Sequence, residues 1–184
     1  MSILLVAGLG NPGRDYADTR HNLGWIVIDA FARKHGLSWS AQPRFHSEVA
    51  RWDRAPGKTL WLVKPLTYMN ESGLALGALQ RFHKLEPVQI AVVYDDLTID
   101  LGLRKISASG SAGGHNGIAS LLEHVGNGFA RYRLGIGPKV PSQMDLKDFV
   151  LGKFTPEQQI LVAQQLESHL SGLALLLDRG VDEA

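Results

Sequence analysis

The chain has 184 residues, 45% of them hydrophobic, which suits one domain with a sizeable core. Its formal net charge of +1 gives no bulk electrostatic signal for nucleic acid, and the lack of cysteine excludes disulfides, a cysteine nucleophile and thiolate metal sites. The first residues form too short an apolar run, without basic residues before it, for a signal peptide or a membrane span. We therefore expect a cytoplasmic protein that does not contact a membrane.

Strand-like and helix-like segments alternate along the chain. Strands are predicted at residues 3–9, 47–52, 60–63, 88–94, 103–106 and 131–136, where apolar or alternating residues run together. Helices are predicted at residues 22–35, 70–84 and 117–125 and from 156 onward, where apolar residues recur at helical spacing. This alternation predicts a single α/β domain over residues 1–184, with three α/β/α layers and a central, twisted, mixed β-sheet.

Polar clusters lie at the ends of these strands, where ligands gather in such sheets. They span residues 10–22, 67–73 and 95–96, and a fourth cluster at 110–117 opens a helix. Residues 8–13 read GLGNPG and match the G-x-G-x-x-G dinucleotide pattern, but that pattern needs a helix to begin within the glycines, and the next helix begins only near residue 22. A nucleotide-dependent oxidoreductase is therefore an alternative with little support, and we expect no cofactor.

His21 and Asp95 carry the most chemical information. A histidine near a carboxylate has a fixed tautomer and serves as a general base near neutral pH, whereas a lone histidine ahead of a helix is more often a surface or capping residue. Asp95 and Asp96 follow a buried strand, where paired acids bind Mg²⁺ or orient a histidine. Because no third ligand stands at a recognisable spacing, we favour orientation of a histidine and expect no metal. Asp96 also has the plainer interpretation of a solvated loop acid.

Amides and glycines complete the candidate site. Asn11 lies at a strand-to-loop corner, and Asn70 has two interpretations, as the cap of a helix or as an amide offered to a substrate carbonyl. Residues 110–117 read GSAGGHNG and form either an anion-binding nest or a mobile loop, with His115 and Asn116 close to a ligand. Because no G-x-S-x-G nucleophile motif is present, attack by an activated water is the simplest chemistry.

In combination, these motifs resemble those of bacterial-type peptidyl-tRNA hydrolases. The resemblance rests on segments that occur in the family's order: GLGNPG at 8–13, Tyr16 with TRHN at 19–22, PLTYMNESG at 65–73, YDDL at 94–97, GSAGGHNG at 110–117, RLGIG at 133–137 and FVL at 149–151. The resemblance implies a monomeric α/β/α enzyme without a cofactor. Such an enzyme cleaves the ester between a peptide and the terminal ribose of tRNA, and so rescues tRNA from abandoned chains in translation.

The resemblance also assigns roles to particular residues. It implies that His21 is the general base, that Asp95 orients it and that Asn11 belongs to the catalytic set. It places a larger set of residues in contact with the peptide and the tRNA: Tyr16, Met69, Asn70, Lys105, Gly113, Gly114, His115, Asn116 and Arg133. It further implies that the C-terminal helix and the segment before it form a lid over the cleft.

The expected tRNA phosphate contact departs from the family's pattern. Family members pair two basic residues there, and Arg133 matches the second of them. Ser107 stands where the first is usual, with Arg104 and Lys105 nearby, and either neighbour is a candidate for the missing charge. A non-catalytic RNA-binding relative of the same fold is the alternative function, and the intact catalytic residues argue against it.

Overall fold

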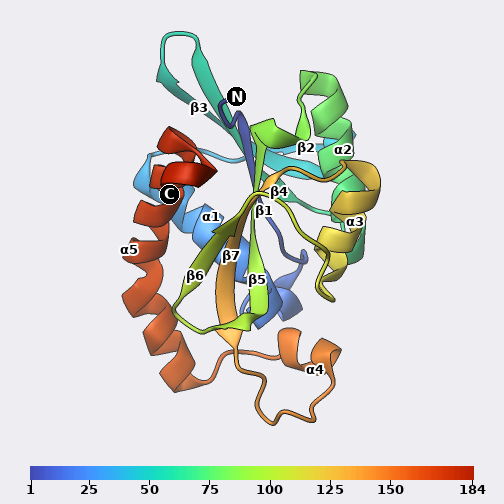
Figure 1. The fold of residues 1–184 in the computed structure, drawn as a ribbon, viewed down its shortest axis with the longest axis vertical. Helices are drawn as coiled ribbons and strands as arrows, with labels where there is room; N and C mark the ends of the chain where they lie inside the picture. The colour runs from blue at the N-terminus through green and yellow to red at the C-terminus, as the bar shows by residue number, and fades with distance from the viewer.

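Strand β1 (Leu5–Gly8) is buried along its whole length and lies at the centre of a seven-stranded sheet. The computed structural model describes residues 1–184, and Figure 1 shows the sheet between two layers of helices. The strands follow the order β2-β3-β4-β1-β5-β7-β6. The other six are β2 (Ser40–Gln42), β3 (Ser47–Ala55), β4 (Lys58–Pro65), β5 (Ile90–Asp100), β6 (Arg104–Ser107) and β7 (Ala130–Gly137). Because β4, β1, β5 and β7 are parallel while β2–β3, β3–β4 and β6–β7 pair antiparallel, the predicted mixed sheet is confirmed.

Helices cover both faces of the sheet (Figure 1). One apolar cluster joins Phe31 of α1 to Leu173 of α5, and a second joins Leu76 of α2 to Ile118 of α3. The helices are α1 (Leu23–Lys34), α2 (Ser72–His83), α3 (Asn116–His124), α4 (Leu146–Val150) and α5 (Pro156–Arg179). Short 3-10 helices complete the chain: η1 (Arg14–Tyr16), η2 (Arg20–Asn22), η3 (Pro43–Phe45), η4 (Met69–Glu71), η5 (Pro87–Gln89) and η6 (Val181–Glu183).

β5 is longer than its apolar run predicts, and this places the site acids inside a strand. The predicted strand ends at residue 94, whereas β5 continues to Asp100 because it stays paired with β7, with a register shift between Asp96 and Asp100. Its other neighbour, β1, ends at Gly8, which pairs with Val93. Asp95 and Asp96 therefore lie in β5 just past the end of β1, where one side of the strand is open.

The start of α2 differs from expectation at Asn70. Asn70 lies in η4, and α2 begins at Ser72 with Glu71 as its N-cap residue and no side-chain cap. Asn70 therefore does not cap the helix, and its amide is left for the cavity. Neither β2 nor α4 was among the predicted elements, because segments of three and five residues are too short to show a hydrophobic period.

The C-terminal helix α5 is a core element. Its buried leucines at 170, 173, 176 and 177 join the cluster on α1, and none of its residues lines the large cavity beside Asp95. By length and composition α5 is apolar enough to cross a membrane, but its leucine face is packed in the core of this fold. The segment before α5 does border the cavity, through Leu146, Lys147, Val150 and Leu151, and a lid that includes the final helix stays a prediction.

His169 on α5 makes the fold sensitive to acid. The residue is 2% exposed and its Nδ1 has no hydrogen-bond partner. Burial, with a smaller contribution from the charge of Arg104, lowers the pKa of His169 from 6.5 to about 4. Between these two pH values the unfolded chain binds a proton that the folded protein does not, so the free energy of unfolding falls as the pH drops through this window.

Replacement of His169 by Phe is expected to remove this acid-sensitive contribution. The Tm difference between the variant and the wild type should change by a few degrees from neutral pH to about pH 4, because roughly 1 kcal/mol moves the Tm of such a domain by about 2–4 °C. Melting curves across a pH series measure the effect. A Tm difference that does not vary with pH would contradict it.

Candidate active site

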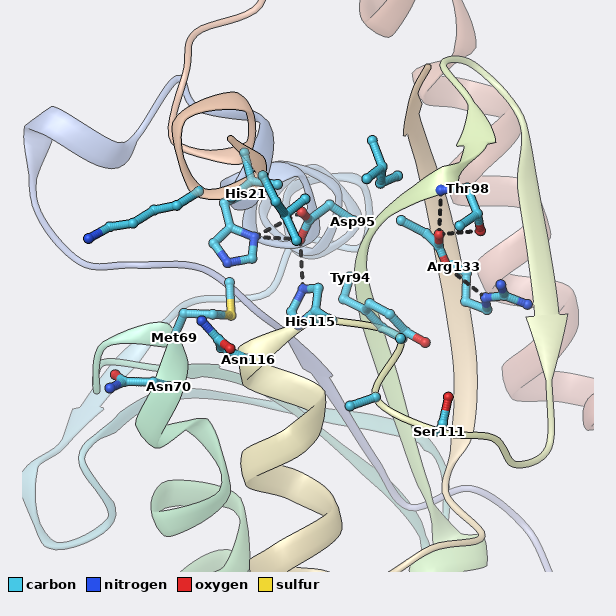
Figure 2. Close-up of a pocket in the computed structure, with 18 of the residues that line it drawn as sticks. His21, Met69, Asn70, Tyr94, Asp95, Thr98, Ser111, His115, Asn116 and Arg133 are labelled. Carbon is cyan, nitrogen blue, oxygen red and sulfur yellow. Dashed lines mark hydrogen bonds and ion pairs between the residues drawn. The ribbon is translucent and has the colours of Figure 1, made fainter. Parts of the chain in front are cut away.

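A cavity of about 760 Å³ opens where β5 extends past the end of β1. Its wall is formed by residues from all four polar clusters of the sequence, together with β7 and the segment that contains α4. Figure 2 shows the side chains that gather at its centre: His21, Met69, Asn70, Asp95, His115 and Asn116.

Asp95 lies between two histidines. Its Oδ2 is 2.8 Å from Nδ1 of His21, and its Oδ1 is 2.9 Å from Nε2 of His115 (Figure 2). The backbone N–H of Ile118 donates to Nδ1 of His115 at 3.2 Å, so His115 carries its ring hydrogen on Nε2 and donates it to Asp95. His21 donates to the same carboxylate from Nδ1, which leaves its Nε2 unprotonated and able to accept a proton.

The Asp95 carboxylate stays ionised although the residue is only 2% exposed. Burial on its own raises the pKa of Asp95, but the charges and hydrogen bonds of His21 and His115 outweigh burial and hold that pKa below its usual range. A fixed negative charge beside His21 stabilises the imidazolium that forms when His21 accepts a proton. The pair therefore has the geometry of a general base and its orienting acid.

Asn11 and Asn22 fix the loop that leads from β1 to His21. The Asn22 side chain accepts from the Asn11 backbone N–H at 2.9 Å and donates to the Asn11 carbonyl at 3.0 Å. Oδ1 of Asn11 accepts from the Met69 backbone N–H at 2.7 Å, which leaves Nδ2 of Asn11 as the donor available to the cavity. The role of Asn22 was not predicted from the sequence, because an asparagine just before a helix has the ordinary interpretation of a cap.

Two further amides lie beside Met69 at the cavity (Figure 2). Asn70 comes from η4 and Asn116 from the first residue of α3, and both are exposed, whereas Met69 is buried. An amide side chain can donate to a carbonyl and accept from an N–H at the same time. Asn70 and Asn116 are therefore suited to bind a peptide group.

Tyr16 does not line the cavity, in contrast to its expected place. Its ring packs edge-on against Tyr68, with 6.2 Å between the ring centroids. Tyr68 is 56% exposed and does line the cavity. The place of Tyr68 was not predicted, since a residue between two predicted elements carries no periodic signal. The two rings together form an aromatic rim, with Tyr68 on its inner side.

Arg131 of β7 fixes the glycine-rich loop. Gly113 and Gly114 have φ values of +57° and +82°, a left-handed conformation that favours glycine. Arg131 is 3% exposed and donates to the carbonyls of Gly110 and Ser111, so the first part of the loop is held against the sheet. The role of Arg131 was not predicted, although its alternation with residue 133 along a strand places both side chains on the same face.

Arg133 lines the cavity in an ion pair. Its Nε donates to Oδ2 of Asp96 at 2.9 Å, and its Nη1 donates to Oγ of Ser107 at 3.0 Å. Asp96 also accepts from the backbone and hydroxyl of Thr98 (Figure 2). The interpretation of Asp96 as a solvated loop acid is therefore corrected, because this carboxylate orients Arg133.

The strand register separates the two candidates for the second basic residue. Lys105 of β6 pairs directly with Arg133, so both side chains point to the cavity side of the sheet, and Lys105 is exposed. Arg104 points to the opposite face, where its Nη1 donates to Oγ of Ser168 on α5 at 2.9 Å. Of the two, only Lys105 is placed to act together with Arg133.

His21, Asp95 and His115 are also the residues that could hold a metal ion, since their ligand atoms lie within 4.8 Å of one another. A metal on His115 would need the lone pair of Nε2, which would move the ring hydrogen to Nδ1. There it would meet the Ile118 N–H that now donates to Nδ1. The hydrogen-bonded arrangement therefore opposes metal binding at this position.

Excess Zn²⁺, or EDTA, is expected to leave the Tm of the protein unchanged, because a ligand stabilises a protein only when it binds the folded state. Melting curves with and without each reagent measure this. A rise in Tm with Zn²⁺ that disappears in His115→Ala would show coordination in place of hydrogen bonding.

Comparison with known proteins identifies the family of this chain. The profile of the peptidyl-tRNA hydrolase family matches residues 5–184. A peptidyl-tRNA hydrolase of Gloeobacter violaceus is 42% identical to this chain, over 100% of this chain and 92% of the relative. One of Mycobacterium tuberculosis is also 42% identical, over 98% of this chain and 94% of the relative. The crystal structure of the peptidyl-tRNA hydrolase from Acinetobacter baumannii matches with a TM-score of 0.89 at 34% identity, over 98% of this chain and 93% of that one. The resemblance in the sequence is thus confirmed, and the chain belongs to the peptidyl-tRNA hydrolase family.

Proposed function

We propose that this protein hydrolyses the ester bond between a peptide, or an N-blocked aminoacyl group, and the terminal ribose of tRNA. The products are free tRNA and free peptide. One observation carries the proposal: Nδ1 of His21 is bonded to the buried, ionised Asp95, so that Nε2 is the free base in a cavity surrounded by amides. Membership of the family supports the choice of substrate.

The reaction needs one base and one oxyanion donor. His21 takes a proton from water at Nε2 while the water oxygen attacks the ester carbonyl carbon. The former carbonyl oxygen becomes negative, and Nδ2 of Asn11 donates to it, while Asp95 stabilises the imidazolium. The intermediate then breaks its bond to the ribose oxygen. That oxygen takes the proton from His21 and leaves as the hydroxyl group of tRNA.

Selectivity for a blocked amino group follows from the exposed amides. Asn70 or Asn116 can accept a hydrogen bond from the N–H of a peptide bond. The free amino group of aminoacyl-tRNA is a charged ammonium. Beside Asn70 and Asn116 it would lose its hydration, and this loss would raise the free energy of binding. Free aminoacyl-tRNA is therefore spared.

The setting of the activity is part of the same proposal. The protein acts as a cytoplasmic monomer on the acceptor end of peptidyl-tRNA, in the rescue of ribosomes and tRNA during translation, without a cofactor or a membrane partner. A non-catalytic RNA-binding role is not favoured, because binding alone needs neither the ionised Asp95 nor a free Nε2 on His21.

His21→Ala is expected to lower kcat by roughly 10²–10⁴-fold, the contribution of a general base, while substrate binding is retained. The assay incubates each protein with N-acetyl-aminoacyl-tRNA and measures the release of free tRNA, with free aminoacyl-tRNA as the substrate that should be spared. Turnover by the variant near the wild-type rate would remove the role from His21. Absence of activity in the wild type would refute the proposed function itself.

Lys105 and Arg133 are expected to contact phosphates of the tRNA. Each phosphate contact that is lost should flatten the slope of log affinity against log salt by roughly 0.7–0.9. Lys105→Ala and Arg133→Ala should therefore weaken full-length tRNA substrates, with less salt dependence, and leave a minimal substrate that ends at the terminal nucleoside unchanged. Arg104→Ala is the matched control, because Arg104 points to the opposite face of β6.

The measurement is kcat/KM for both substrates across a salt series. If Arg133→Ala slows the minimal substrate as much as the full tRNA, Arg133 is structural. If Arg104→Ala changes the salt slope as much as Lys105→Ala does, the assignment of Lys105 is wrong.

A further inference from the structure

Arg20 directly precedes the base His21 in η2, and its own side chain takes no part in the cavity wall. The residue is 9% exposed, and its guanidinium lies over the ring of Phe149, 4.3 Å from the ring centroid. Nη1 donates to the carbonyl of Phe149 at 3.1 Å, and Nη2 donates to Oε1 of Gln158 at 3.0 Å. Arg20 thus binds both the end of α4 and the start of α5.

The backbone around Arg20 makes a second connection to the same region. The Arg20 N–H donates to the carbonyl of Gly152 at 3.0 Å, and Thr19 forms an isolated antiparallel bridge with Lys153. The guanidinium is closely confined, since a Cβ added at Gly152 would lie 2.7 Å from its Nη1. Both acceptors of the side chain are uncharged, so Arg20 is buried without a carboxylate partner.

The segment that Arg20 holds is one wall of the active-site cavity. Leu146, Lys147, Val150 and Leu151 line the cavity from α4 and the residue after it. His21 lines the same cavity, one residue along the chain from Arg20. The Arg20 side chain, together with the neighbouring backbone, therefore connects the loop that carries the base to the wall that the substrate would meet.

We propose that Arg20 is a positioning residue, which sets the α4 wall of the cavity in register with the ring of His21. The expected effect of Arg20 on kcat rests on the proposed function, since it assumes that His21 is the general base. A planar guanidinium can serve two acceptors and stack on a ring at once, whereas the single ammonium of lysine cannot. Loss of register of about 1 Å between base and substrate is enough to lower a rate by roughly 100-fold.

Two variants disturb this contact independently. Arg20→Lys keeps the positive charge and removes the pair of hydrogen bonds to Phe149 and Gln158. Gly152→Ala keeps Arg20 and displaces its guanidinium with a methyl group. Arg54→Lys is the matched control: Arg54 donates to the carbonyl of Leu177 and to Asp178 at the other end of α5, far from the cavity wall.

The experiment measures kcat, KM and Tm of these variants, and the ring N–H signals of His21 and His115 in histidine-¹⁵N-labelled protein. Arg20→Lys and Gly152→Ala should lower kcat by about 10- to 100-fold at a temperature where each is folded. KM should change by less than about threefold, since binding rests largely on distant tRNA phosphate contacts. The His21 signal should shift, while the His115 signal and the Arg54→Lys kinetics stay at wild-type values.

The proposal is overturned if Arg20→Lys and Gly152→Ala both keep the wild-type kcat. It is also overturned if Arg54→Lys loses as much kcat as these two variants do when its Tm falls by the same amount. The histidine signals test it separately from the proposed function, because they need no turnover. If the wild type does not hydrolyse peptidyl-tRNA, an unshifted His21 signal in the Arg20 and Gly152 variants still refutes the positioning role. Should Arg20→Lys not fold, Gly152→Ala alone decides.

Discussion

The buried carboxylate of Asp95, bonded to two imidazoles, is the interaction on which the rest of the site depends. A charge with 2% exposure is costly unless it receives hydrogen bonds, and His21 and His115 supply them from opposite sides. The three residues come from η2, β5 and the start of α3, which meet only when the sheet and its helices are assembled. Folding and the preparation of the base are therefore the same event.

His115 extends this dependence into α3. Its Nδ1 accepts from the Ile118 N–H as the N-cap of the helix, and this bond places the ring hydrogen on Nε2, toward Asp95. Asp95 thus accepts a hydrogen bond from each imidazole, and its negative charge is in place to stabilise His21 when that ring becomes an imidazolium. The loop before His115 has to be tight for this, and the positive φ values of Gly113 and Gly114 provide the turn.

Local patterns in the sequence predicted the layers and the central strands, because an apolar run and a helical period are visible over a few residues. Polar residues at strand ends predicted a site at that edge of the sheet, and the pairing of His21 with Asp95 was implied by the family resemblance. The partners of these residues could not be predicted in the same way. Asn22 binds backbone that is 11 positions away and Arg20 binds a carbonyl 129 positions away, and no local pattern reports such contacts. The tautomer of His115 likewise depends on a bond that exists only after α3 has formed.

The packing of α5 limits how the cavity can change shape. The leucines of α5 are buried against α1, so this helix cannot move away without opening the core. The segment before it is different: residues 138–148 are half-buried or exposed, and Phe149 is the only buried residue of α4. The stretch between β7 and Gly152 therefore has few buried apolar side chains to oppose its movement. The Arg20 side chain lies between this stretch and α5, and it donates one hydrogen bond to each.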